Sequence, residues 1–228
     1  MSKREIEAAS AVVLAGGLSR RLGRDKRRLR LWGEHGPTLL EHTVATVASL
    51  CTDVVVVLND PADWPDLPAQ IVGDRYPDGG ALGGIYSGVL AARAEYALVV
   101  ACDMPLLHAP LLQAMLARKR DYDALVPRSP RPGDARNGLD LEPLHAIYAK
   151  RCLAPMQAAL EAGRGGLSHS CRRFTLPTSI RQNRVVTIHT VTHSSISTRL
   201  SRWTRRAGCL HVILINRYRS PFPMILDF

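Results

Sequence analysis

Short apolar runs alternate with longer, more polar segments over residues 11–162. The runs are mostly valine-rich, and several end at glycine, asparagine or aspartate, which is typical of strands buried in a parallel sheet. The segments between them have the length of helices that cover such a sheet, and Thr38 with Glu41 forms a capping-box pattern at the start of one of them. The sequence therefore predicts an α/β fold with a doubly wound, mostly parallel sheet flanked by helices. The expected strands are residues 11–14, 53–58, 71–72, 97–101 and 123–127, and the expected helices are residues 38–50, 84–93, 110–120 and 152–162.

Charge is distributed unevenly along the chain. The net charge is +10, but residues 1–171 hold 20 basic and 19 acidic residues and are nearly neutral. Residues 172–228 hold ten arginines, no lysine and one acid, Asp227. A basic surface for nucleic acid on the main domain is therefore not supported, and the aromatic residues of the basic segment are scattered. Nucleic acid is not expected as a partner.

The composition changes near residue 172 and predicts two units, a domain over residues 1–171 and an atypical basic tail over residues 172–228. No clean period of two or 3.6 residues persists in the tail. Two explanations are open: the tail is a divergent or disordered extension, or the reading frame has shifted near residue 172. The joint loss of acids and lysines, with more arginine and serine, favours the frameshift hypothesis.

Targeting and cysteine signals are weak. No apolar run approaches the roughly 20 residues that a membrane-spanning helix needs, and the first ten residues lack the apolar core of a signal peptide. We therefore expect a cytoplasmic protein with no membrane partner. The five cysteines are widely spaced without a CxxC pair, so we expect small buried residues and not a zinc or disulfide framework.

The stretch AVVLAGGLSRRLGRDK, residues 11–26, joins the first expected strand to glycines and cations. Gly16 and Gly17 let backbone N–H groups approach a phosphate without a Cβ in the way. Arg21 and Lys26 add cationic donors for the same oxygens. The pattern is neither GxGxxG nor GxxxxGK[ST], so spacing alone leaves a basic surface loop as the alternative to a triphosphate-binding loop.

Polar residues also follow the other expected strands. Asn59, Asp74 and Asp103 each lie one or two residues beyond a strand. Ligands in doubly wound sheets bind at the carboxyl ends of the strands, so we expect these residues to lie along one edge with Gly16. Asp103 is placed to hold Mg²⁺, which prefers oxygen ligands and bridges phosphates; the alternative is that it caps the next helix.

Three motifs in order resemble those of the molybdenum cofactor guanylyltransferases, a nucleotidyltransferase family with a glycosyltransferase-A-like fold. Residues 14–26 match the signature LAGGxSxRMGxDK except at Leu22, which replaces methionine. Residues 77–88, PDGGALGGIYSG, resemble a GPLGGIxxGL run that closes over the nucleotide and acceptor. Residues 102–105, CDMP, resemble the strand end that binds metal in the family.

The resemblance implies transfer of GMP from GTP to molybdopterin or its molybdenum-loaded form, with release of pyrophosphate. It implies that Arg21 and Lys26 steady the triphosphate and that Asp103 is the Mg²⁺ ligand. It also implies cofactor-delivery proteins and acceptor molybdoenzymes as partners. By resemblance, the nucleotide pocket is lined by Leu14, Ala15, Gly16, Gly17, Asn59 and Asp74.

Two further comparisons with the family pattern bear on the acceptor and on activity. The segment LEPLHAIY, residues 141–148, resembles a late strand of the family that reaches the acceptor pocket, with Glu142 and His145 as candidate contacts. A lone histidine in a strand is more often structural. An NxNTPEDL-like segment, which supplies asparagines near the metal in the family, is not recognisable in the tail.

Alternative functions stay open at this point. Relatives that transfer CMP tend to read LAAG where this chain reads LAGG, which favours guanine. A cytidylyltransferase or a sugar-phosphate nucleotidyltransferase of the same fold is the nearest alternative. A non-catalytic nucleotide-binding protein is another, because the last active-site segment is not recognisable.

Overall fold

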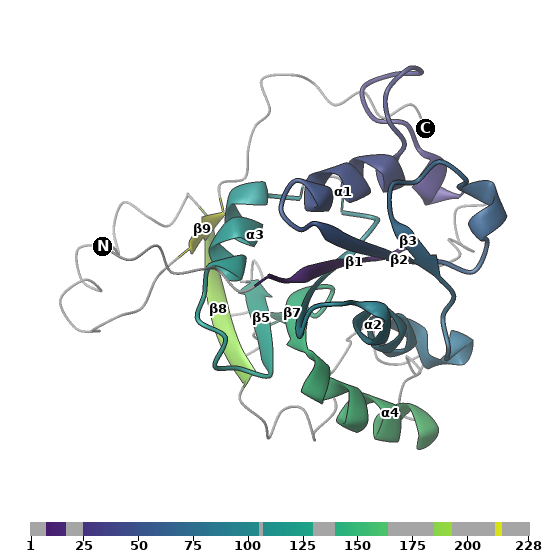
Figure 1. The fold of residues 1–228 in the computed structure, drawn as a ribbon. Coiled ribbons are helices and arrows are strands. Elements are labelled where there is room, and N and C mark those ends of the chain that lie inside the picture. Colours follow the sequence, from purple (N-terminus) through teal and green to yellow (C-terminus); the bar gives the residue numbers. More distant parts are fainter. Residues whose placement is uncertain are drawn as a thin grey trace.

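The described residues form a mixed sheet with helices on both faces (Figure 1). The computed structural model describes residues 8–16, 25–104, 107–129, 140–163, 185–192 and 213–215. In these segments nine strands occur in the order β3-β2-β1-β4-β7-β5-β8-β9, with β6 paired to β5. The α/β class and the mostly parallel, doubly wound sheet that the sequence predicts are confirmed. Gly17, Arg21 and Leu22 lie outside the described residues.

The parallel part of the sheet is built around β1 (Ser10–Leu14). This strand pairs in parallel with β2 (Asp53–Val57) on one side and with β4 (Tyr96–Ala101) on the other. β3 (Gln70–Val72) continues the parallel pairing beyond β2. Neighbouring side chains of a strand point to opposite faces, and helices cover both faces, so continuous apolar runs suit these positions.

The antiparallel part of the sheet contains β7 (His145–Ala149), which lies between β4 and β5 (Ala124–Ser129) and runs opposite to both. The short β6 (Asp140–Leu141) is also antiparallel to β5. The resemblance to the family implies one strand over residues 141–148, and this expectation is wrong in detail. A turn that contains Pro143 separates β6 from β7, and proline has no N–H to donate to a ladder.

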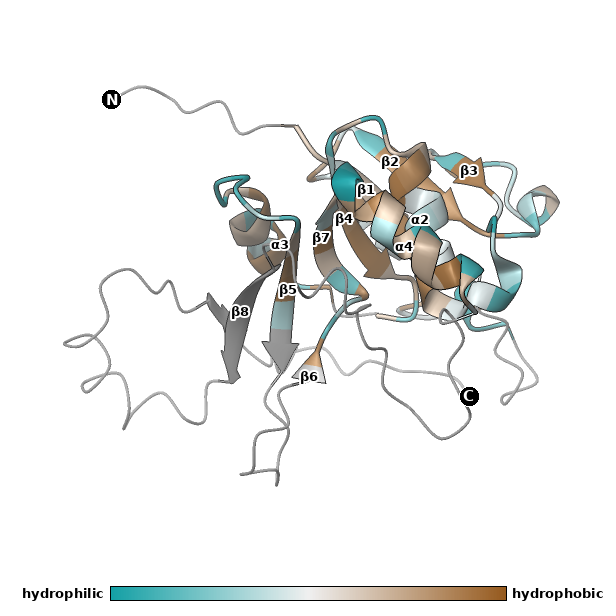
Figure 2. Ribbon diagram, turned by 90° about the horizontal axis from the view of Figure 1, so that it is seen from below, coloured by the Kyte–Doolittle hydropathy of each residue, from teal (hydrophilic) through white to brown (hydrophobic). Residues whose placement is uncertain are grey.

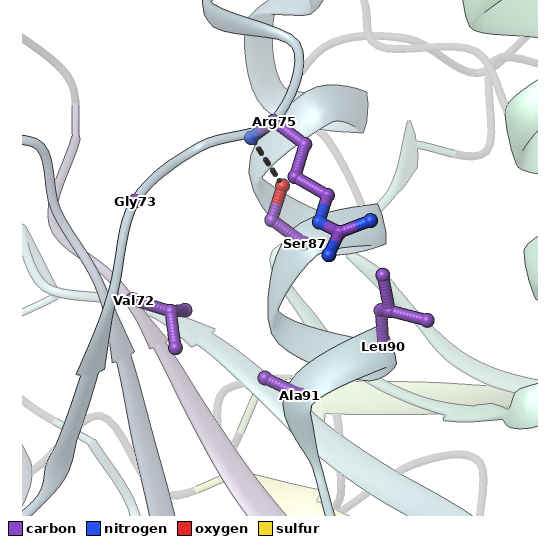
Figure 3. A pocket seen from close by; sticks show the side chains of 6 residues that line it. All are labelled: Val72, Gly73, Arg75, Ser87, Leu90 and Ala91. Atoms are coloured by element: carbon purple, nitrogen blue, oxygen red, sulfur yellow. Dashed lines mark hydrogen bonds between the residues drawn. The ribbon is translucent and has the colours of Figure 1, made fainter.

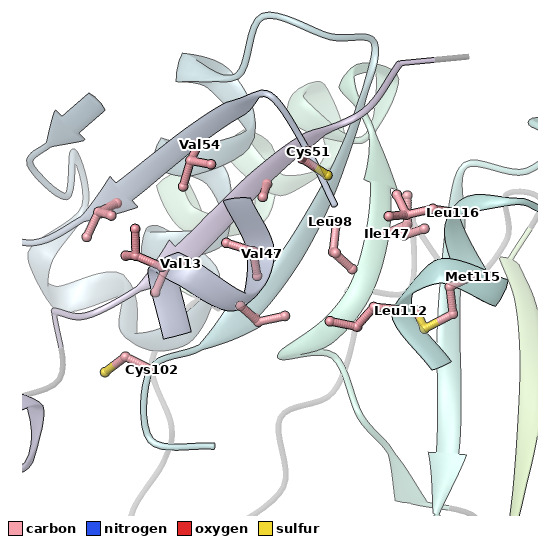
Figure 4. Close-up of a cluster of buried hydrophobic side chains, with 14 of the residues drawn as sticks. Val13, Val47, Cys51, Val54, Leu98, Cys102, Leu112, Met115, Leu116 and Ile147 are labelled. Carbon is pink, nitrogen blue, oxygen red and sulfur yellow. The ribbon is translucent and has the colours of Figure 1, made fainter. Parts of the chain in front are cut away.

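The helices cover the two faces in pairs. α1 (Leu39–Ala48) and α3 (Ala109–Leu116) contribute to one hydrophobic cluster, and α2 (Gly80–Ala91) and α4 (Leu153–Glu161) contribute to the other. Figure 2 shows α2 and α4 together over the apolar strands. In Figure 4, side chains from α1, α3 and the strands meet in the first cluster.

Local sequence signals predict the start of α1 correctly, but they misplace the start of α2 and the end of α3. The capping box is present: Thr38 Oγ1 accepts from the Glu41 N–H at 3.2 Å, and Glu41 Oε2 accepts from the Thr38 N–H at 2.6 Å. α2 starts four residues before the expected helix, and α3 ends four residues earlier than expected. Short 3₁₀ turns occur at η1 (Lys26–Arg28), η2 (Pro61–Asp63), η3 (Pro77–Gly79) and η4 (Lys150–Cys152).

The basic tail contributes two strands to the sheet. β8 (Val185–Thr192) runs parallel to β5, and β9 (Ile213–Ile215) runs parallel to β8. The sequence shows no clean period in the tail, so neither strand is expected from it. The boundary at residue 171 stays a prediction.

Three cysteines, Cys51, Cys102 and Cys152, are free and buried, as expected. Burial raises the pKa of Cys51 to about 11 and the pKa of Cys102 to about 12, so both thiols stay protonated at neutral pH. Among the described residues, none of the helices is long and apolar enough to cross a membrane.

A glycine of α2 sets how closely this helix approaches β1. A Cβ at Gly88 would overlap Val12 Cγ1 and would lie 3.1 Å from Val57 Cγ2. Both neighbours belong to central strands that are completely or almost completely buried. The helix therefore lies against the sheet at a distance that only glycine permits here.

We predict that Gly88→Ala lowers the free energy of unfolding by about 1–3 kcal/mol, because the extra methyl group overpacks the contact between helix and sheet. Urea unfolding at neutral pH measures the change. Gly84→Ala is the matched control, since its Cβ would lie 3.4 Å from Leu14 Cδ2, an ordinary contact. Equal losses of stability in the two variants would contradict the prediction.

Candidate functional site

Backbone hydrogen bonds continue the parallel ladder just past the carboxyl ends of the central strands. The Ala15 N–H donates to Val57 O at 2.9 Å, and the Cys102 N–H donates to Leu14 O at 3.0 Å. The first residue after β1 and the first after β4 are thereby fixed to neighbouring strands. The expectation that the candidate residues lie along one edge of the sheet is confirmed, although their roles stay predictions. The described candidates that follow these strand ends are Gly16, Asn59, Asp74 and Asp103.

A hydrogen-bond network joins Asn59 to Asp74. The Asp74 N–H donates to Asn59 Oδ1 at 2.8 Å, and Asp74 Oδ1 accepts from the Tyr76 N–H at 2.9 Å. Ser87 Oγ of α2 lies 3.1 Å from the same Asp74 oxygen. A Cβ at Gly83 would lie 3.0 Å from Asp74 Oδ1, so α2 approaches this network closely. In the described part of the chain Asp74 Oδ2 and Asn59 Nδ2 have no hydrogen-bond partner, which leaves one acceptor and one donor for a ligand.

Two adjacent cations of η1 have opposite surroundings. Lys26 is partly buried, and its ammonium group has no hydrogen bond or ion pair within the described segments. Arg27 has an 8% exposed side chain and forms ion pairs with Asp25 at 2.8 Å and with Asp60 at 2.5 Å. The sequence singles out Lys26 but gives no signal for Arg27, because Asp60 lies 33 residues away.

The ion pairs around Arg27 also set the charge state of its partners. Hydrogen bonding to the Arg27 guanidinium holds the pKa of Asp25 and the pKa of Asp60 below their usual range, although burial opposes the shift. The two carboxylates raise the pKa of Arg27 further. A carboxyl group whose pKa is lowered in the folded state stabilises the fold at neutral pH, and this effect is lost as the pH falls from the ordinary pKa through the lowered value.

Asp103 lies on the exposed edge after β4. It does not cap the next helix: α3 has His108 as its N-cap, with His108 Nδ1 accepting from the Leu111 N–H at 3.2 Å. The Asp103 carboxylate has no hydrogen bond or ion pair in the part of the chain that the structure describes. This position and exposure fit Mg²⁺, which commonly binds one or two carboxylates together with substrate phosphates and water. Within the same part, no group of three or more His, Cys, Asp or Glu side chains could hold a metal ion by itself.

His145 begins β7 at the same edge and is only 7% exposed. Neither of its ring nitrogens has a hydrogen-bond partner among the described residues. Burial, with a smaller contribution from His108, lowers the pKa of His145 to about 4, so the ring is neutral at physiological pH. Glu142, the other candidate for the acceptor pocket, is partly buried in the turn before β7.

A pocket of about 420 Å³ lies between the end of β3 and α2 (Figure 3). Ser87 Oγ accepts from the Arg75 N–H at 2.9 Å beside it. None of the candidate site residues lines this pocket, but Gly73 and Arg75 flank Asp74, and Ser87 Oγ lies 3.1 Å from Asp74 Oδ1, so the pocket adjoins the candidate edge at the end of β3. Its lining residues are Val72, Gly73, Arg75, Ser87, Leu90 and Ala91.

Comparison with known proteins identifies this architecture. The model of the MobA-like NTP transferase domain matches residues 11–177, which include every candidate residue of the edge. The chain belongs to this family. The MobA-like family assignment confirms the nucleotidyltransferase class and the resemblance to molybdenum cofactor guanylyltransferases that the sequence indicated.

Named relatives of this MobA-like chain agree with the assignment. A probable molybdenum cofactor guanylyltransferase of Chloroflexus aggregans is 50% identical over 155 residues, covering 68% of this chain and 72% of the relative. The molybdenum cofactor guanylyltransferase of Desulfosudis oleivorans is 34% identical over 160 residues, covering 70% of this chain and 74% of the relative. The crystal structure of molybdopterin-guanine dinucleotide biosynthesis protein A from Archaeoglobus fulgidus matches with a TM-score of 0.58 at 23% identity. The match covers 79% of this chain and 83% of the crystallised chain, and it supports the fold.

We predict that His145 makes folding stability depend on pH between 6.5 and 4. The unfolded chain binds a proton near the ordinary histidine pKa of 6.5, whereas folded His145 does so only at about 4. Stability is therefore complete above pH 6.5 and decreases as the pH falls towards 4, by roughly 3 kcal/mol at most. Urea unfolding from pH 4 to 7.5 measures the decrease.

His145→Phe should remove most of this pH dependence, while His35→Gln, a change in an exposed histidine, should retain it. The same slope in the wild-type protein and in His145→Phe would rule out His145 as the source.

Proposed function

We propose that this chain transfers GMP from GTP to the terminal phosphate of molybdopterin or of its molybdenum-loaded form and releases pyrophosphate. The observation that carries the proposal is the 50% identity with a relative named as a probable molybdenum cofactor guanylyltransferase. The edge of the sheet supports it, because nucleotide-binding candidates from four strands lie side by side there. The sequence LAGG at residues 14–17 favours guanine over cytosine as the base of the nucleotide substrate.

The nucleotide is proposed to bind across the ends of β1, β2 and β3. Leu14, Ala15, Gly16 and Gly17 would line the nucleotide pocket, and the two glycines would let backbone N–H groups approach the nucleotide without a Cβ in the way. Asn59 and Asp74 are prearranged by their shared hydrogen bond of 2.8 Å, and each keeps a polar atom for the base or the ribose. Prearranged donors and acceptors bind with a smaller loss of conformational entropy than mobile ones.

The triphosphate and its metal are proposed to lie between the glycine-rich loop and β4. Arg21 and Lys26 neutralise phosphate charge, and Lys26 has no competing partner in the described structure. Asp103 would hold Mg²⁺. The bound metal ion would offset the negative charge that develops on the phosphates.

The chemistry needs little beyond positioning and charge neutralisation. An acceptor phosphate oxygen forms a bond to the α-phosphorus in line, and the bond from this phosphorus to the bridging oxygen breaks, so that pyrophosphate leaves. The acceptor oxygen is already anionic, and no general base is required. The Cys102 thiol has a pKa of about 12 and stays protonated, so it is not the nucleophile.

The cellular setting is also a proposal. We place the reaction in the cytoplasm, with cofactor-delivery proteins and acceptor molybdoenzymes as macromolecular partners. For residues 172–228 we keep the hypothesis of a shifted reading frame, which rests on the joint loss of acids and lysines in this segment. Resequencing the locus tests it, and an intact frame would refute it.

We predict that GTP with Mg²⁺ raises the melting temperature more than CTP, ATP or UTP. A ligand at 100 times its Kd adds about 2.7 kcal/mol to the stability of the folded state. Thermal melting with each nucleotide, with and without Mg²⁺, is the measurement. A preference for CTP would change the product to a cytosine dinucleotide, and no shift with any nucleotide, from a protein that melts cooperatively, would indicate a broken site.

We predict that Asp103→Ala reduces turnover by at least about 100-fold while leaving the melting temperature nearly unchanged, because the carboxylate is exposed and is proposed to hold the metal. Pyrophosphate release with GTP, Mg²⁺ and molybdopterin measures turnover. Asp121→Ala, at an exposed aspartate between α3 and β5, is the control and should keep full activity. Near-normal rates in Asp103→Ala would remove Asp103 from the proposed mechanism.

A further inference from the structure

Arg27 uses every hydrogen-bond donor of its side chain. Its Nε and Nη2 atoms donate to the two oxygens of Asp25, each at 2.8 Å. Nη1 donates to Asp60 Oδ1 at 2.7 Å, and Nη2 donates to Asp60 Oδ2 at 2.5 Å. Nη1 also donates to the backbone oxygen of Ala15 at 3.1 Å. A guanidinium group has five N–H donors, so none is left for a ligand.

These five bonds connect two loops that strand pairing leaves separate. Ala15 and Asp25 belong to the segment after β1, whereas Asp60 belongs to the segment after β2. Lys26 directly precedes Arg27, and Asn59 directly precedes Asp60. Arg27 therefore fixes the backbone on both sides of the proposed nucleotide pocket.

A second set of contacts supports the same connection. Arg28 Nη2 lies 2.7 Å from Asp63 Oδ2, so η1 and η2 are also joined by an ion pair. The guanidinium carbons of Arg27 and Arg28 lie 6.0 and 5.0 Å from the centre of the Trp64 ring, which is 6% exposed. These contacts shield one side of Arg27 from solvent and leave little space for another arrangement of the two loops.

We propose that Arg27 is a positioning residue for nucleotide binding, which holds Lys26 towards the triphosphate and Asn59 towards the base by joining the loops after β1 and β2. This inference rests on the proposed function. Arg27 cannot itself bind a phosphate without giving up a bond to a carboxylate or to Ala15. Lysine cannot replace it, because a single ammonium group cannot reproduce the two forked contacts.

The test compares Arg27→Lys with Arg151→Lys. Arg151 is the matched control, because it also pairs with an aspartate, Asp123, and hydrogen-bonds Tyr96 Oη at 3.1 Å, but it lies at the opposite end of the strands. Calorimetry gives the Kd for GTP with Mg²⁺ in the absence of acceptor. Steady-state kinetics gives the KM for GTP, the KM for molybdopterin and kcat, and thermal melting gives stability.

Arg27→Lys is expected to raise the Kd and the KM for GTP about tenfold or more and to leave the KM for molybdopterin within about twofold. Arg151→Lys is expected to lower the melting temperature without changing the Kd for GTP. A merely structural role would reduce the active fraction, and hence kcat, in both variants with unchanged KM. That result, or unchanged GTP binding in Arg27→Lys, overturns the inference while leaving the proposed function intact.

Two further outcomes are decisive. If Arg27→Lys does not fold, Asp60→Asn replaces it in the test, because the amide keeps one acceptor oxygen but removes the ion pair. A folded Asp60→Asn variant with an unchanged Kd for GTP overturns the inference. If the wild-type protein binds no GTP, the proposed function fails and the inference fails with it.

Discussion

The pairing of β1 with β2 and β4 is the constraint on which the rest of the structure depends. Val12 faces the cluster under α2, and Val13 faces the cluster under α1, so both hydrophobic layers depend on one register. A slip by one residue would exchange these faces and move every residue after the strand. Because both faces are buried, the hydrophobic effect opposes such a slip strongly. The start of the glycine-rich loop is thereby fixed by the packing of the core.

Strand pairing determines where the loops begin but not how they continue. Among the described residues that follow β1 and β2, charged side chains at residues 25–28 and 60–63 connect the two loops. Arg27 provides this connection between Asp25 and Asp60, with its charge largely removed from solvent. Removing one partner of such a pair leaves a poorly solvated charge without a counter-charge. The resulting loss of folding free energy is larger than the net stabilisation that the intact pair provides. The core of the protein is thus held by apolar packing, whereas the geometry of the proposed nucleotide pocket depends on ion pairs.

The sequence predicted most of what is local and little of what is long-range. Valine runs identified β1, β2 and β4, and the Thr38 capping box identified the start of α1, because these signals lie within a few neighbouring residues. The early start of α2 was missed, because glycines disfavour an isolated helix, although here they allow close packing on the sheet. Arg27 stands in a run of cations that suggests phosphate binding, and only the fold shows that Asp60 neutralises it. The placement of Asn59, Asp74 and Asp103 was predictable, because the carboxyl ends of parallel strands share one edge.

The basic tail illustrates how differently strands and sites depend on sequence. β8 pairs with β5 through backbone groups that every residue except proline possesses, and its sequence VVTIHTVT is rich in the β-branched residues that favour strands. An exposed edge of β5 would otherwise offer unpaired N–H and C=O groups to other chains. A segment with altered side chains can therefore still complete the sheet. It cannot replace specific asparagines near a metal, because these act through particular side-chain oxygens. On the frameshift hypothesis, the fold would consequently stay largely complete while the chemistry would be reduced.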